Sequence, residues 1–225
     1  MDGNVLHSSQ FPRFRVRDPM SALTHFIAFV AAIFGTPILL VHAAAEVASL
    51  SAMVSLSIFM VSMVLLYGAS SAYHTFALSD RGIKTLKKLD HVMIFFLIAG
   101  SYTPVCTVRL GSAGLKLLVL VWGLAVAGAV FKLCWVTCPK WVSSVIYIAM
   151  GWSCVTAMPQ ILATLTTVGF LWLLAGGIVY TVGGVLYALK PKGLEGKRFG
   201  IHEIFHVFVM GGSLCHYIFM YGYLL

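Results

Sequence analysis

Residues 165–189, LTTVGFLWLLAGGIVYTVGGVLYAL, contain no charged side chain. A helix needs roughly 20 apolar residues to cross a hydrocarbon layer about 30 Å thick. A backbone in lipid must satisfy its own hydrogen bonds, and this stretch is too long and too continuously apolar for a barrel strand. The stretch therefore predicts a transmembrane helix.

Six further apolar runs fill most of the remaining chain. Hydrophobic residues make up 60% of the sequence, charged residues only 10%, and the mean hydropathy is +0.95, which excludes a soluble domain of this length. We expect an all-α integral membrane protein with a short N-terminal segment (1–19) and one seven-helix transmembrane domain (20–225). The expected spans are 20–44, 50–78, 88–108, 113–134, 141–159, 165–189 and 201–224.

The basic residues predict the orientation of this bundle. Seven spans place thirteen lysines and arginines on the side of the N-terminus and only Arg109 and Lys116 on the other side. The positive-inside rule then predicts a cytoplasmic N-terminus, an external C-terminus and a multi-pass protein of the plasma membrane, such as a bacterial cytoplasmic membrane. The net charge of +8 is explained by orientation and anionic lipid head groups, so we expect no nucleic-acid partner. The first 19 residues have no apolar h-region, and we expect no cleavable signal peptide.

Ionisable residues inside the spans are costly and usually functional. Ser70 and His74 lie four residues apart near the inner end of the second span, and Asp90 begins the third span. His202 and His206 occupy the first two turns of the last span. At 1.5 Å per residue, all lie within roughly 10 Å of the inner boundary, so three distant segments bring them to one depth.

Two histidines at positions i and i+4 of a helix can bind one metal ion. Together with His74, they predict a zinc site with three imidazoles and an open fourth position, one ion per chain. Asp90 could act as a general base, or be a fourth ligand that closes the site, and Ser70 could orient Asp90, a water or a substrate carbonyl. Interhelical hydrogen bonding without metal is the alternative. His25, His91 and Glu203 are candidates for contacts around the site, whereas we interpret His7, His42 and His216 as interfacial anchors.

These motifs resemble the hemolysin III family, which belongs with the progestin and adipoQ receptors, including the adiponectin receptors. The matching elements are Ser70-x3-His74, Asp90-His91-x8-Gly100-Ser-Tyr-Thr-Pro104, His202-x3-His206 and the opening Ala22-Leu-Thr-His25. The resemblance extends from about residue 18 to the end of the chain.

The resemblance implies a zinc ion near the cytoplasmic face, bound by His74, His202 and His206, with Asp90 contacting a metal-bound water. Because the wider superfamily includes alkaline ceramidases, it also implies hydrolysis of a lipid amide. The receptors carry a long N-terminal region, and this chain, with about 19 residues there, looks like the short bacterial type.

Several functions are compatible with these features. The first hypothesis is a zinc-dependent hydrolase of a lipid amide or ester whose substrate enters from the membrane. The second is a non-enzymatic membrane sensor or regulator, or a cytolytic factor, with structural zinc. A third follows from His202-Glu203-Ile-Phe-His206, which matches the H-E-x-x-H signature of metalloproteases with Glu203 as base, although no acidic ligand follows it. Membrane lipids are the expected partners, and a homo-oligomer stays open.

Overall fold

The computed structural model describes residues 15–194, 196 and 199–225; of the N-terminal segment expected at 1–19, residues 1–14 lie outside this part. The described residues form helices joined by short connections, and seven of the helical segments are long and apolar enough to span a membrane. The prediction of an all-α, seven-helix membrane protein is therefore confirmed. The elements are α1 (Pro19–Ala45), α2 (Leu50–Thr75), α3 (Asp80–Val108), α4 (Gly111–Cys134), α5 (Lys140–Gly151), η1 (Trp152–Ala157), α6 (Met158–Thr164), α7 (Thr167–Leu189) and α8 (Ile201–Gly222).

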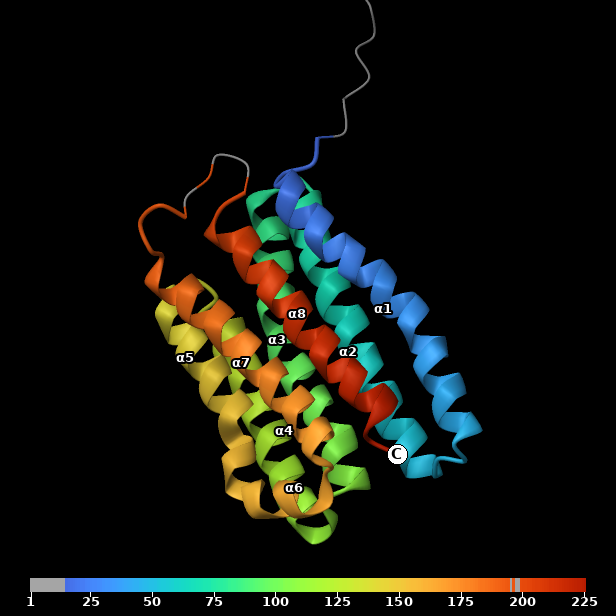
Figure 1. Cartoon of the computed structure of the whole chain (residues 1–225). Coiled ribbons are helices and arrows are strands. Elements are labelled where there is room, and N and C mark those ends of the chain that lie inside the picture. Colours follow the sequence, from blue (N-terminus) through green and yellow to red (C-terminus); the bar gives the residue numbers. More distant parts are fainter. Residues whose placement is uncertain (1–14, 195, 197–198) are drawn as a thin grey trace, which may run out of the picture.

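The spans form a closed ring. Each of α1, α2, α3 and α4 packs against the next, α5 packs against α3, α4 and α7, and α8 closes the ring by packing against α7 and α1. Figure 1 shows α1 at one side of the bundle, with the start of α1 and the C-terminus at opposite ends. This arrangement brings the end of α2 and the starts of α3 and α8 to the end at which α1 begins.

Two spans differ from the expected ranges. α3 begins at Asp80 rather than at 88, because the Ser79 hydroxyl accepts a hydrogen bond from the Gly82 amide and caps the helix. The fifth span is not one helix: α5 ends at Gly151, a 3₁₀ turn follows, and α6 carries Pro159 in its first turn. Proline has no amide hydrogen to donate, so it suits the start of a new helix better than the interior of a continuous one.

Glycines let α7 and α8 approach closely. A Cβ atom on Gly176 would lie 2.4 Å from Cδ2 and 2.6 Å from Nε2 of His216, whereas one on Gly177 would meet no atom within 4 Å. The two neighbouring glycines therefore differ in what a methyl group would contact.

We expect Gly176→Ala to destabilise the fold by about 1–3 kcal/mol through overpacking. Gly177→Ala should be neutral or stabilising by about 0.5–1 kcal/mol, because alanine favours helix at no steric cost here. Thermal unfolding of both variants in one detergent measures the difference, and equal midpoints would contradict this packing.

Candidate metal centre

Two helix ends supply the three histidines that the sequence singles out. His74 lies in the last turn of α2, while His202 and His206 lie in the first two turns of α8. His74 and His206 are buried and His202 is half-buried. We refer to these three residues as the histidine centre.

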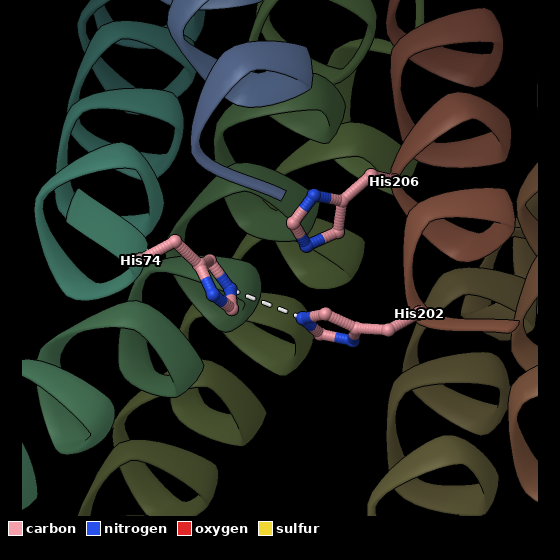
Figure 2. Close-up of side chains that lie close together, drawn as sticks. All are labelled: His74, His202 and His206. Carbon is pink, nitrogen blue, oxygen red and sulfur yellow. Dashed lines mark hydrogen bonds between the residues drawn. The ribbon is translucent and has the colours of Figure 1, made fainter. Parts of the chain in front are cut away.

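The rings of the histidine centre point toward one another (Figure 2). One nitrogen from each ring can be chosen so that all three atoms lie within 4.8 Å of one another. The closest pair is Nε2 of His74 and Nε2 of His202, at 3.0 Å. Two nitrogens bound tetrahedrally to one zinc ion would lie about 3.4 Å apart. Small side-chain adjustments would therefore let the three imidazoles hold a metal ion.

A carboxylate that the sequence analysis missed orients His74. Oδ2 of Asp18 lies 3.0 Å from Nδ1 of His74, and Nε of Arg17 donates to the same oxygen at 2.9 Å. Burial raises the pKa of the Asp18 carboxyl, but the hydrogen bonds from His74 and Arg17 outweigh this effect and hold the pKa below its usual value. Asp18 is therefore an anion that fixes the ring of His74.

The backbone places Asp18 at this position. The amide of Arg17 donates to the carbonyl of Thr75 at 3.2 Å, and the amide of Asp18 donates to the carbonyl of His74 at 2.9 Å. An aspartate directly before Pro19 is typical of a helix cap, yet the Asp18 side chain makes no capping hydrogen bond. The sequence signal was thus present, but it indicated a different role.

Thr24 orients His206 in a similar way. The Thr24 hydroxyl donates its hydrogen to the carbonyl of Ser21 at 2.9 Å, so its oxygen can accept from Nδ1 of His206 at 3.0 Å. Nδ1 of His206 then carries the proton. An Asp18 carboxylate can only accept, so Nδ1 of His74 carries a proton as well. Both rings keep the lone pair of Nε2 free for a metal ion.

Asp90 and Ser70 lie near the centre but outside the group of three. Asp90 is 7% exposed and Ser70 is 1% exposed. The Ser70 hydroxyl interacts with the Asp90 carboxyl, although its oxygen makes no hydrogen bond of ordinary geometry. Within the described residues, the group that could hold a metal ion consists of histidines alone.

The other histidine candidates also lie close by. His25 is buried and stacks on His206 with 3.5 Å between ring centroids, and among the described residues neither of its ring nitrogens has a partner at ordinary hydrogen-bond geometry. The His91 carbonyl accepts from Tyr147 at 3.0 Å, and Nδ1 of the His91 ring is buried with no hydrogen-bond partner in the part of the chain that the structure describes. These unpartnered nitrogens keep polar atoms available around the centre.

Glu203 links α8 to α1. One carboxylate oxygen accepts a hydrogen bond from the Ser21 hydroxyl, and the other accepts from the Gly200 amide at 2.8 Å. The side chain therefore closes the first turn of α8 and fixes it to the start of α1. These contacts explain a glutamate at this position without a role as a protease base.

One cavity of about 600 Å³ joins the candidate residues. At one end it is lined by the histidine centre with Ser70, Asp90 and His91. Along α3 its lining runs from Lys87 to Cys106, about 29 Å at 1.5 Å per residue. Most of the side chains further along this path are apolar, so the polar residues gather at one end of a long apolar chamber.

The model of one protein family, described as haemolysin-III related, matches residues 15–217. The chain belongs to this family. Hemolysin-3 of Bacillus cereus is 37% identical over 194 residues, which cover 86% of this chain and 85% of that protein. The hemolysin-3 homolog of Bacillus subtilis is 38% identical over 194 residues, covering 86% and 87%.

The family also has relatives in animals. The human monocyte to macrophage differentiation factor is 27% identical over 166 residues, or 71% of this chain and 66% of that protein. Membership of the hemolysin III family, which the motifs around His74, Asp90 and His202 predict, is therefore confirmed.

Proposed function

We propose that this hemolysin III protein is a zinc-dependent hydrolase of a lipid amide or ester in the plasma membrane. One zinc ion per chain is held by Nε2 of His74, His202 and His206. The observation that carries the proposal is the convergence of three imidazoles, two of them buried, at the polar end of a long apolar cavity. Three nitrogen ligands and an open position are typical of catalytic rather than structural zinc.

The hydrogen bonds behind the rings support this assignment. Histidines that bind metal usually donate their second ring N–H to a carboxylate or another oxygen, which fixes the ring and raises its basicity. Asp18 supplies that oxygen to His74, and Thr24 supplies it to His206. Without a metal ion, two Nε2 atoms at 3.0 Å need a proton between them, which removes one of the two free lone pairs.

Zinc, when bound, supplies Lewis-acid polarisation of a carbonyl and brings the pKa of a bound water to about 7. The chain itself supplies the proton acceptor and the walls of the site. Asp90 would accept a proton from the attacking water on its carboxylate, and Ser70 would orient that carboxylate. The apolar lining along α3 accommodates the hydrocarbon of the lipid and excludes water from it.

Ceramides, N-acyl amides and acyl esters are the compounds with which to test this activity. Purified protein with its full metal complement should release fatty acid from at least one of these classes. A protein that holds zinc and releases fatty acid from none of them would instead favour a structural metal in a sensor or regulator.

The contacts behind the rings predict a change in metal affinity. Asp18→Asn removes the anion behind His74, and Thr24→Val removes the acceptor behind His206 while keeping the side-chain shape. We expect each variant to bind zinc about 10–100-fold more weakly. Competition with a chelator of known affinity measures this, with the exposed Asp80→Asn as the matched control. A zinc affinity within about twofold of wild type in both variants would show that these contacts do not contribute to metal binding.

A further inference from the structure

A second polar cluster borders the same cavity. It consists of Lys132 in the last turn of α4, Cys138 in the following loop and Ser143 in the first turns of α5, and we call it the lysine centre. Nζ of Lys132 donates to Oγ of Ser143 at 2.5 Å and to Sγ of Cys138 at 3.1 Å, and the latter two atoms lie 3.3 Å apart. All three residues are buried, and Lys132 is completely inaccessible.

Lys132 has no acidic partner in the part of the chain that the structure describes. The ion pairs found there involve Asp18 with Arg17 and His74, and the carboxyl of Asp90 interacts with Arg17 and Lys87 rather than with Lys132. The ring of Phe131, with its centroid 5.9 Å from Nζ, is a weak substitute. A fully buried lysine is rare unless its charge is paired, so a partner for this charge is missing.

The cavity is where that partner can bind. Cys138 and Ser143 line the cavity, with Lys132 behind them, and Ser144 and Lys140 line the same wall. The Ser143 oxygen accepts from Lys132, so the Ser143 hydrogen can donate either to Sγ of Cys138, 3.3 Å away, or to an acceptor in the cavity. The N-terminus of α5, the positive end of a twelve-residue helix, begins at the same place. Every one of these features favours a negative charge.

The lysine centre and the histidine centre face one chamber. His91 lies within electrostatic range of Lys132 and also of His74 and His202. Beyond this level the chamber is mainly apolar along α3. A ligand that satisfies both the cationic wall and the apolar lining must combine an anionic group with a hydrocarbon chain.

We propose that the lysine centre binds the anionic head group, a carboxylate or a phosphate, of a single-chain amphiphile whose hydrocarbon occupies the apolar part of the cavity. Ser143 donates a hydrogen bond to the anion, and Lys132 supplies the compensating charge behind it. The inference does not require hydrolysis at the histidine centre. A fatty-acid carboxylate released there is one ligand of this class.

Competition binding to purified protein in a neutral detergent tests the proposal. Tritiated palmitate is the probe, and palmitate, hexadecyl phosphate, hexadecanol and inorganic phosphate are the competitors. A charged hydrogen bond predicts that at least one anionic amphiphile displaces the probe at an about tenfold lower concentration than hexadecanol. The relative potencies of palmitate and hexadecyl phosphate show whether the site prefers a carboxylate or a phosphate head group. Equal potency of hexadecanol, or displacement by inorganic phosphate at the concentrations that palmitate needs, overturns the proposal.

Variants assign the preference to residues. In Lys132→Met protein, the concentrations of hexadecanol and of the anionic amphiphile that displace the probe should differ by no more than about twofold. Lys116→Met, on the other side of the membrane, should leave the ratio of these two concentrations unchanged. If Lys132→Met does not fold, Ser143→Ala is the test variant, and we expect the ratio of displacing concentrations to fall by about threefold or more. A ratio unaffected in both variants overturns the proposal.

The histidine centre needs its own control, because a bound metal ion could also attract an anion. His202→Ala protein treated with a chelator should keep the preference for the anionic amphiphile. If the preference disappears in this protein, it originates at the histidine centre and the lysine centre is not the site. Wild-type protein that shows no hydrolytic activity but retains the preference contradicts the proposed hydrolase and leaves this inference standing.

Discussion

Purified His202→Ala protein is expected to contain less than about a tenth of a zinc ion per chain, whereas wild-type protein contains about one. The substitution leaves two imidazoles, His74 and His206, on different helices. Two neutral ligands in a partly apolar cavity compensate poorly for the dehydration of a divalent cation, so the affinity falls steeply. Elemental analysis of protein purified without added metal gives the stoichiometry directly.

His42→Ala is the matched control for this measurement. His42 lies near the far end of α1 and stacks on Tyr221 with ring centroids 4.0 Å apart, away from the histidine centre. It should retain the wild-type metal content, and gel filtration of both variants checks that they remain folded. Wild-type protein that purifies without stoichiometric metal would remove the basis of the proposed function.

Asp90→Asn is expected to lower the rate of lipid hydrolysis by about 10²–10⁴-fold while the zinc content stays near one per chain. An amide has nearly the shape of the carboxyl group but cannot take the proton. Because the group that could hold the metal contains only histidines, the loss of this carboxylate should leave the ion in place. Fatty-acid release and elemental analysis on the same preparation separate the two effects.

Asp80→Asn controls for the loss of one acidic side chain on α3, because Asp80 is exposed in the first turn of that helix. It should hydrolyse at the wild-type rate. If Asp90→Asn loses its zinc, then Asp90 is a ligand, and the closed structural site becomes the better description. If it keeps both zinc and full activity, another group must accept the proton.

Much of the fold follows from composition, because lipid leaves a backbone few choices. A long uncharged stretch such as 165–189 must be helical, and the described chain has seven segments that are long and apolar enough to span a membrane. The early start of α3 at Asp80 was missed because its first turns are polar and carry no hydropathy signal. The break at Gly151 was missed for the opposite reason, since apolar composition is the same for one helix or two short ones.

Only part of the candidate site could be predicted from the sequence. His202 and His206 are one turn apart, so their convergence follows from helix geometry, and equal depth relates them to His74. Asp18 and Thr24 belong to the start of α1, and their partners lie 56 and 182 residues away in the chain. No local pattern encodes such a contact, and each residue had a simpler local explanation.

The lysine centre shows the same limit. Lys132 looks like one more positive residue at the inner end of a span, and charge counting assigns it to orientation. Only the packing of α4 against the start of α5 buries it with Cys138 and Ser143 and leaves its charge without an acidic partner among the described residues. The burial of Lys132 is therefore what identifies a candidate binding site at a residue that the sequence marks only as a positive charge at the inner end of a span.

The sequence by itself determined the seven spans, their expected orientation and the level at which the polar residues gather, because hydrophobicity, charge and helical rise act along the chain. The tertiary structure alone decided which atoms meet. The closure of the helix ring by α8 brings Nε2 of His202 to 3.0 Å from Nε2 of His74. The start of α1 brings Asp18 to Nδ1, the other nitrogen of the His74 imidazole. These contacts depend on packing between helices far apart in sequence, where differences of an ångström determine whether a metal ion can be held.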